Sequence, residues 1–553
     1  YATIFDMRTN RRHFLASTLA TSLSGLTKAS TYASSNWSGD TIKHLIPTAN
    51  HEEFQIRVVF NEPQTAPVLK IASTWVSGSP ADTQRTGWTF HPRDLTPDTQ
   101  YELSLWSGNQ TQPQRLSDPW PLKTYPHPEA QPDHARILIY TCAGGHPLMS
   151  EGSQSIFQPM ATRQALLERG LSFKPDALIA IGDQIYWDQR TILESTNPAR
   201  RARSQTIYTR AGLLDRALAA AGTRNEDVLK VVAGEQITPL YGTMLRSTPS
   251  YFVNDDHDYF ENDEATKRFV TLPPYDYQVR FTDYVRNLYL PDFMRDPARS
   301  RPISGDRKDG MNASFGTLRW GRLLEILMYD CAGYLSLKGR TAGLVPANVE
   351  QWLKQRTASE EISQLLHVPS HPMGWSAGKW REWYPDVADT GGAGAQTAQI
   401  GVDGQAFKLT TDKPKFMWQE GWWQQHQRLV KALSAQKHRT PVVLSGDLHA
   451  TEHARIIKSG NLELKDNPVN TMITGPIGTG MGWPSQARGT APQAANHLTL
   501  KSPQEIREKN GFTIVDAYRD HLRVRLFAWR REESSVDEIT SLMPYHDVQL
   551  ARR

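Results

Sequence analysis

Short runs of apolar residues alternate with helix-length segments from Arg136 onward, and this alternation constrains the fold more than any other feature of the sequence. The runs cover residues 137–140, 177–181, 251–253, 323–329, 442–444 and 471–474. Strands that are apolar on both faces are needed where helices cover both faces of a sheet. We therefore expect residues 134–550 to form one large α/β domain around a buried sheet.

Four of these runs are followed by side chains that bind metal ions in proteins. They are Cys142 after the first run, Asp183 and Tyr186 after the second, Asp255, Asp256, His257 and Asp258 after the third, and Asp447 and His449 after the fifth. Ligands of open α/β sheets bind beyond the carboxyl ends of the strands, so we expect these side chains to surround one cavity. Carboxylates suit divalent cations, whereas thiolate and phenolate favour a more acidic metal such as ferric iron.

The order of these motifs resembles that of the PhoD-like alkaline phosphatase/phosphodiesterase family, a branch of the calcineurin-like metallophosphoesterase superfamily. That family has Cys at the first strand, Gly-Asp-x-x-Tyr at the second, Asp-Asp-His at the third and Gly-Asp-x-His at the last. The matching residues here are Cys142, Gly182-Asp183-x-x-Tyr186, Asp255-Asp256-His257 and Gly446-Asp447-x-His449. The resemblance implies the four-layer α/β sandwich of that superfamily over residues 134–550.

The resemblance also implies two cofactors, Ca²⁺ and Fe³⁺, and a hydroxide held by them that attacks phosphorus in line. The implied ligands are Asp183 between the ions, Cys142, Tyr186 and His449 on the iron side, and Asp256 and Asp447 on the calcium side. The implied catalytic residues are Asp183 and His257, and His257 is expected to stabilise the phosphoryl charge or protonate the leaving oxygen. Its neighbours Asp255 and Asp258 are expected to orient its ring.

Several positions near these motifs leave alternatives open. Asp255 and His371 are further candidate ligands, and the alternative for His371 is a loop histidine at the rim of the pocket. His453, four residues after the last motif histidine, is a candidate to contact a metal ligand. Where the family usually has Arg after the aspartate at position 330, this chain has Cys331. Its only other cysteine is Cys142, and a bridge between the two is left open.

The N-terminal residues are typical of an export leader. Residues 10–15, Asn-Arg-Arg-His-Phe-Leu, match the twin-arginine pattern, and a weakly apolar stretch extends to residue 26. We predict a twin-arginine signal peptide over residues 1–35, recognition by the twin-arginine translocation machinery, and a periplasmic or secreted protein. The alternative is a basic leader without an export function. No later segment reaches roughly 18 uninterrupted apolar residues, so we expect no transmembrane anchor.

Residues 45–126 alternate between apolar and polar side chains, as short half-buried strands do. Within them, residues 95–101 resemble the turn before the tyrosine corner of fibronectin type III domains, where a hydroxyl such as that of Tyr101 caps the backbone. We therefore expect a small fibronectin-III-like β-sandwich with a scaffold role.

The charges are nearly balanced, with 62 Lys and Arg against 58 Asp and Glu, which argues against dedicated nucleic-acid binding. The expected partner is a phosphate ester substrate. Residues 200–230 are expected to be helical, with Leu213 and Leu218 among their apolar positions. Specificity is expected to lie in loops such as residues 190–250 and 301–312, whose many arginines suit an anionic substrate, although exposed arginine is the ordinary explanation.

Two motifs point to other functions. Residues 374–378 fit the Gly-x-Ser-x-Gly elbow of serine hydrolases around Ser376, but prolines interrupt the run before it. Residues 475–480 are rich in glycine but lack the Lys and Ser/Thr of a phosphate-binding loop, so we interpret them as a loop near the site.

We therefore predict an exported, metal-dependent phosphoester hydrolase with phosphodiesterase or alkaline phosphatase activity. One alternative is a non-catalytic protein that binds a surface ligand on a degenerate metallophosphoesterase fold. Degenerate copies usually lose ligands, whereas every expected metal position is filled here. The other alternative is a serine esterase at Ser376, which would be insensitive to chelators.

Overall fold

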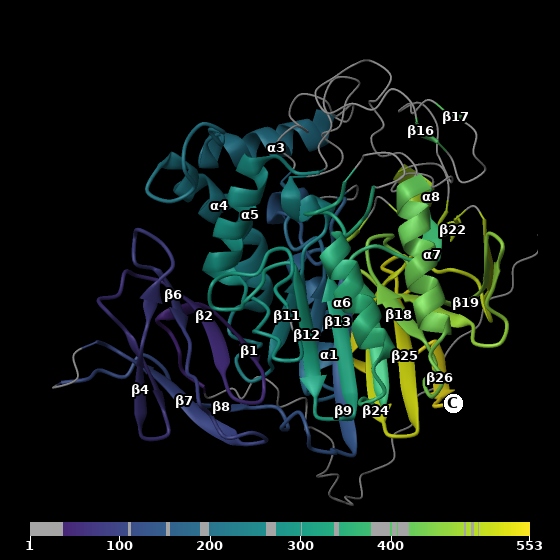
Figure 1. Cartoon of the computed structure of the whole chain (residues 1–553). Coiled ribbons are helices and arrows are strands. Elements are labelled where there is room, and N and C mark those ends of the chain that lie inside the picture. The colour runs from purple at the N-terminus through teal and green to yellow at the C-terminus, as the bar shows by residue number, and fades with distance from the viewer. Residues whose placement is uncertain are drawn as a thin grey trace, which may run out of the picture.

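The computed structural model describes residues 37–108, 112–150, 155–187, 198–260, 273–299, 301–336, 342–377, 399–400, 406–407, 420–480, 483–487, 491–495 and 497–553 (Figure 1). The signal peptide predicted over residues 1–35 lies outside these ranges. No helix within them is long and apolar enough to cross a membrane.

The N-terminal part consists of two four-stranded antiparallel sheets. One has the order β1 (Ile42–Ala49), β2 (Phe54–Phe60), β6 (Gly87–Phe90), β5 (Ser79–Pro80), and the other β4 (Thr74–Ser77), β3 (Val68–Ile71), β7 (Gln100–Trp106), β8 (Trp120–Lys123). Their apolar faces share one core, which includes Ile56 and Leu103. The hydroxyl of Tyr101 accepts a hydrogen bond from the backbone N–H of Thr96 at 2.8 Å. The relationship to fibronectin type III domains stays a prediction.

A six-stranded sheet carries the first three apolar runs. Its order is β11 (Ser250–Val253), β10 (Ala177–Ile181), β9 (His134–Thr141), β24 (Asn510–Tyr518), β25 (His521–Trp529), β26 (His546–Ala551). β9, β10 and β11 are parallel, and β24, β25 and β26 extend the sheet with antiparallel pairs. Every residue of β10 and β11 is buried, as their uninterrupted apolar sequence predicts.

An eight-stranded sheet carries the other three runs. Its order is β12 (Phe315–Trp320), β13 (Leu324–Tyr329), β14 (Gln364–Pro369), β18 (Val442–Ser445), β21 (Val469–Ile473), β19 (Glu452–Ser459), β20 (Leu462–Glu463), with β23 (Leu498–Lys501) paired to β19. β13, β14, β18 and β21 are parallel, so their carboxyl ends lie at one end of the sheet.

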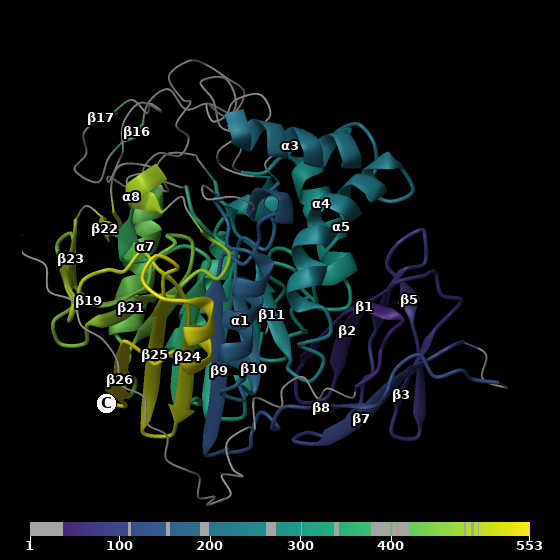
Figure 2. The same cartoon turned by 180° about the vertical axis from the view of Figure 1, so that it is seen from behind.

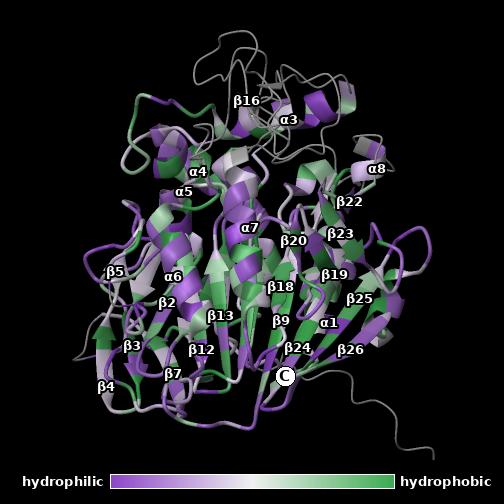
Figure 3. Cartoon of the chain, turned by 45° about the vertical axis from the view of Figure 1, so that its right-hand side comes forward, coloured by the Kyte–Doolittle hydropathy of each residue, from purple (hydrophilic) through white to green (hydrophobic). Residues whose placement is uncertain are grey.

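The two large sheets pack face to face between two layers of helices (Figures 1 and 2). Ile139 and Ile179 of the first sheet share a core with Ile326 and Leu444 of the second. The covering helices are α1 (Met160–Leu171), α4 (Arg224–Tyr241) and α5 (Asp276–Tyr289) on the six-stranded sheet, and α6 (Ala347–Ala358) and α7 (Glu420–Ser434) on the eight-stranded sheet. Hydrophobic residues concentrate on the strands, whereas α6 and α7 present hydrophilic residues outward (Figure 3). The described part therefore has the four layers that the resemblance implies.

The segment over residues 200–230 is helical at both ends, as expected, but the chain turns in its middle. α3 (Pro198–Ala211) ends before Gly212, whose φ of 87° lies in the left-handed region. α4 begins after Thr223, whose side chain caps the first turn. Leu213 and Leu218 lie between the two helices and are 56% and 38% exposed.

A buried ion pair ties the N-terminal sheets to the α/β part. Arg57 of β2 lies 2.7 Å from Asp292, and both side chains are 3% exposed. Arg307 pairs with the same carboxylate. Burial alone would raise the pKa of Asp292, but Arg57 and Arg307 hold it below its ordinary value. Because the folded pKa is lowered, this interaction stabilises the fold above the unfolded pKa and is lost as the pH falls.

We predict that Asp292→Asn lowers the free energy of unfolding by about 3–5 kcal/mol at pH 7, because the charge of Arg57 then stays buried without a carboxylate. Urea unfolding measures the change, and Asp309→Asn, at a side chain that is 43% exposed, is the control. The difference from wild type should shrink as the pH falls below about 4. An unchanged unfolding midpoint in Asp292→Asn contradicts this role.

Candidate metal centre

Four loops meet where strand ends of both large sheets lie together. Cys142 follows β9, Asp183 follows β10 and Asp256 follows β11, all in the six-stranded sheet. Asp447 and His449 follow β18 of the eight-stranded sheet. The site is therefore formed at the carboxyl ends of parallel strands, where open α/β sheets bind ligands.

Three overlapping groups of described side chains have the spacing of metal ligands. They are Cys142, Asp183 and His449; Asp183, Asp256 and His257; and Asp255, Asp256 and Asp447, with the ligand atoms of each group within 4.8 Å of one another. Asp183 and Asp256 each belong to two groups, so the three groups form one continuous cluster. The cluster also includes Asp255, which the sequence offered as a further candidate ligand, and His257, to which the sequence assigned another role.

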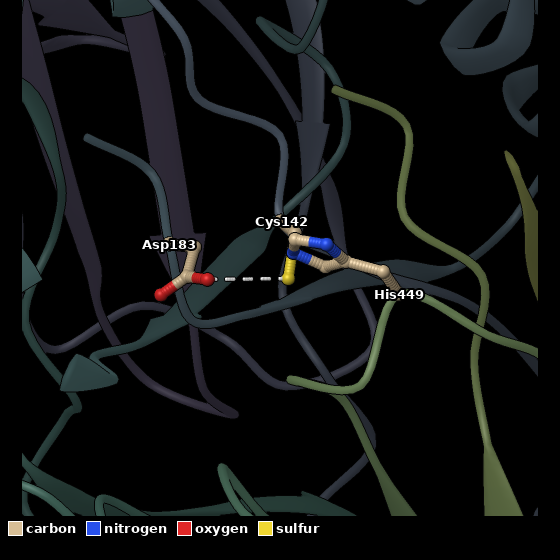
Figure 4. Close-up of side chains that lie close together, drawn as sticks. All are labelled: Cys142, Asp183 and His449. Atoms are coloured by element: carbon tan, nitrogen blue, oxygen red, sulfur yellow. Dashed lines mark hydrogen bonds between the residues drawn. The ribbon is translucent and has the colours of Figure 1, made fainter. Parts of the chain in front are cut away.

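Tyr186 joins the cluster through its hydroxyl, which donates to Oδ2 of Asp183 at 2.8 Å and lies 3.2 Å from Nε2 of His449. Sγ of Cys142 lies 3.3 Å from the same carboxylate oxygen (Figure 4). Burial and the charge of Asp183 raise the pKa of the Cys142 thiol and of the Tyr186 hydroxyl. A bound cation reverses that effect and favours thiolate and phenolate.

Four of the predicted ligands have a left-handed backbone conformation. The φ angle is 47° at Cys142, 55° at Asp183, 71° at Asp447 and 48° at His449. This conformation costs a residue other than glycine about 1–2 kcal/mol, and it concentrates at functional sites. The surrounding loops therefore have to hold these residues in place.

Close packing explains the glycine that precedes each aspartate in the two Gly-Asp motifs. A Cβ on Gly182, whose φ is 65°, would lie 2.4 Å from Cβ of Asp255. A Cβ on Gly446 would lie 2.1 Å from Oγ1 of Thr141. Only glycine lets these loops approach one another closely enough to form the cluster.

Asp258 fastens two of the loops together. Its carboxylate accepts hydrogen bonds from the backbone N–H groups of Asp183, Gln184 and Asp255, each at 2.9 Å. Burial raises the pKa of Asp258 to about 7, against the lowering effect of these hydrogen bonds. The expectation that Asp258 orients the ring of His257 is therefore wrong, because its oxygens face backbone amides.

Several buried polar atoms of the cluster have no hydrogen-bond partner among the described residues. They are Oδ1 of Asp183, Oδ2 of Asp255, Oδ2 of Asp256 and Nδ1 of His257. Each such atom costs about 1–3 kcal/mol, and more if it is charged. Burial and neighbouring carboxylates also raise the pKa of Asp183 and Asp255 well above their ordinary values. Metal cations satisfy such atoms and remove the repulsion, so these residues fit a metal centre.

His371 lies beside the cluster, fully buried, with Nδ1 2.9 Å from Oδ1 of Asp255. Ser370 donates to the same oxygen at 2.9 Å, so Asp255 also faces these residues and not the ring of His257. No group of possible metal ligands in the described part of the chain includes His371. Cys331 is a free thiol, as is Cys142, so the bridge that the sequence left open is absent.

The structure places His453 away from the cluster. Its Nδ1 lies 2.9 Å from Nε2 of His546, and its Nε2 lies 3.0 Å from Oδ1 of Asn470. Both ring nitrogens are occupied, so the expected contact with a metal ligand is wrong. The reason is that β19 begins at Glu452, so His453 lies within this strand and contacts β26 of the other large sheet.

Two side chains that the motifs did not reveal hold the loop of Cys142. Arg163 of α1 is fully buried and donates to the carbonyls of Gly144 and Gly145 at 3.0 and 2.7 Å. Thr141 donates to a carbonyl of β10 at 2.5 Å and lies 3.1 Å from Sγ of Cys142. Thr141 could have been found from its position before Cys142. Arg163 has no sequence signal, because its partners are backbone carbonyls.

The serine motif does not form an elbow. Ser376 lies in β15 (Trp375–Ser376), which pairs antiparallel with β22 (Gln493–Ala494). An elbow needs the serine in a sharp turn that leaves a strand, so the arrangement does not match.

The glycine-rich loop over residues 475–480 lies beside the cluster, as expected. The backbone N–H groups of Ile477 and Gly478 donate to the carbonyls of Thr141 and Cys142 at 3.1 and 2.8 Å. These amides hold the loop of Cys142 and are not available to cradle a phosphate.

Comparison with protein-family models gives no match, and neither does comparison with curated proteins. Among solved structures, a structure of PhoD matches with 13% identity and a TM-score of 0.51, over 88% of this chain and 86% of that chain. A purple acid phosphatase from yellow lupin (Lupinus luteus) seeds gives 11% identity and a TM-score of 0.49, over 93% of this chain and 74% of that chain. The likeness to PhoD confirms, at the level of the fold, the resemblance that the four motifs predicted.

We predict that Gly182→Ala reduces both stability and bound metal, because its Cβ would lie 2.4 Å from Asp255. Gly222→Ala is the matched control, since its φ of 69° is similar but the nearest atom is 3.7 Å away. Left-handed strain should cost both variants about 1–2 kcal/mol of stability, and only Gly182→Ala should lose more. Urea unfolding and elemental analysis measure the two effects, and equal losses in the two variants contradict the packing argument.

Proposed function

We propose that this chain is an exported, metal-dependent phosphoester hydrolase. The observation that carries the proposal is the cluster in which Asp183 and Asp256 are each shared between groups of metal-binding side chains. Shared carboxylates hold two cations close enough to act on one phosphate, and this suits an in-line displacement at phosphorus. The fold shared with PhoD supports the same conclusion.

The donor set suits two different ions. Cys142, Tyr186 and His449 lie on one side of Asp183, and thiolate, phenolate and imidazole favour a transition metal such as Fe³⁺. On the other side, Asp255, Asp256 and Asp447 offer only carboxylate oxygens, which favour a hard cation such as Ca²⁺. When bound, the ions supply positive charge to the phosphoryl oxygens and lower the pKa of water.

His257 is the residue that we place beside the reacting phosphate. Its ring lies 4.3 Å from the ring of Tyr186, which fixes the imidazole next to the cluster, and it is only partly buried. Nδ1 is buried without a hydrogen-bond partner among the described residues, and His257 forms a group of possible ligands with Asp183 and Asp256. An imidazole in this position can stabilise the charge on the phosphoryl oxygens or donate a proton to the leaving oxygen.

The substrate that we propose is a phosphate diester or monoester outside the cytoplasm, reached by export through the twin-arginine machinery. The motif over residues 10–15 supports the export route. The near balance of charge, 62 cationic against 58 anionic side chains, supports a small or neutralised ester over a long nucleic acid.

The test is hydrolysis of a chromogenic phosphodiester and of the matched monoester by the purified protein. We predict turnover that a chelator abolishes and that added metal ions restore. Asp183→Ala should lower kcat by more than about 100-fold, because it removes the shared ligand of the cluster. The ratio of diester to monoester turnover shows whether the protein is mainly a phosphodiesterase or a phosphomonoesterase.

Ser376→Ala is the control variant, because this serine lies in an antiparallel strand pair and should not affect turnover. Turnover that resists both the chelator and Asp183→Ala, and that disappears in Ser376→Ala, would sink the proposal in favour of a serine esterase. A protein that carries its metals and turns over neither ester contradicts it as well.

A further inference from the structure

A groove between the open edges of the two large sheets has the character of a second ligand site. Residues of β19, β21 and β23 line it from one sheet and residues of β26 from the other, and β19 and β26 lie near one another in Figures 1 and 2. Its volume is about 850 Å³, within the range of small-molecule sites. None of its lining residues belongs to the candidate metal centre.

Hydrogen bonds between the two sheets join the two walls of the groove. Nδ1 of His453 in β19 lies 2.9 Å from Nε2 of His546 in β26. Elsewhere along the groove, Thr440 donates to the carbonyl oxygen of Ala551 at 2.6 Å. The oxygen of Asn470 accepts from Nε2 of His453, so Nδ1 of His453 accepts from His546. All five residues line the groove, which is therefore built into the contact between the sheets.

Two exposed cations are paired across neighbouring strands in this groove. Arg455 of β19 and Lys501 of β23 are direct cross-strand partners, and both line the groove. Like charges in that position destabilise a sheet. Neither has an ion pair with an acid among the described residues. The lining also includes Arg553, against a single acidic side chain, Asp466.

This like-charge pair contrasts with its surroundings. Lys458, three residues farther along β19, pairs with Glu463 of β20 at 3.2 Å. Lys465, which is also outside the groove, pairs with the same Glu463 at 3.2 Å. An anion between Arg455 and Lys501 would turn their repulsion into attraction.

We propose that the groove binds a phosphate group between Arg455 and Lys501. The guanidinium fork matches two phosphate oxygens, and the ammonium group adds a compact charge from the other strand. A phosphate carries up to two negative charges near neutral pH, whereas a carboxylate carries one. A phosphate therefore balances the charges of the two cations better than a carboxylate does. The phosphate is either free or part of a phosphate chain. The inference does not rest on the proposed hydrolase activity.

Pyridoxal 5′-phosphate tests the site locally, because its phosphate occupies anion sites and its aldehyde forms an imine with a nearby lysine. The full chain is labelled briefly, the imine is reduced with borohydride, and labelled lysines are located by peptide mass spectrometry. We expect Lys501 to react faster than Lys308, an exposed lysine outside the groove. Inorganic phosphate or tripolyphosphate should protect Lys501, but not Lys308, from labelling. Protection at a lower concentration of inorganic phosphate indicates the free form, and protection at a lower concentration of tripolyphosphate indicates the chain form.

Arg455→Gln should slow the labelling of Lys501 about tenfold, the change expected for one lost charge-assisted hydrogen bond. Arg531→Gln is the matched control, at an exposed arginine outside the groove, and should leave the labelling unchanged. Thermal unfolding checks that both variants are folded. Labelling of Lys501 at the rate of Lys308, without protection by either anion, would overturn the proposal. Unchanged protection in Arg455→Gln would overturn it too.

Discussion

The structure of the candidate metal centre depends on one constraint: buried carboxylates lie close together where strand ends of two sheets meet. Burial and mutual repulsion raise the pKa of Asp183 and Asp255 well above ordinary values, and raise that of Asp258 to about 7. Among the described residues, no lysine or arginine forms an ion pair with them. Metal ions are a form of positive charge that fits this donor set.

The surrounding structure holds this unfavourable cluster together. Left-handed backbone at Cys142, Asp183, Asp447 and His449 stores strain at each loop. The amide hydrogen bonds of Asp258 and the buried layers of both sheets offset it. The same packing that builds the core therefore also positions the candidate ligands.

The sequence predicted the buried strands and their convergence because both follow from local patterns. Uninterrupted apolar runs require covered faces, and Gly-Asp after such a run marks a tight loop at the strand end. The prediction that His453 contacts a metal ligand failed. Its partner His546 lies on β26, ninety-three positions away, and only the packing of the sheets brings the two residues together. Asp258 was misassigned for a similar reason, since its partners are backbone amides of a loop that follows another strand.

The most direct test of the central claim is anomalous X-ray diffraction from crystals of the protein purified without added metals. Ions are predicted at two positions, one among Cys142, Asp183, Tyr186 and His449, and one among Asp255, Asp256 and Asp447. Diffraction data collected above and below the iron absorption edge show whether the ion at the first position is iron. A well-ordered cluster with full carboxylate density and no ion, or ions held only by other residues, would contradict the account.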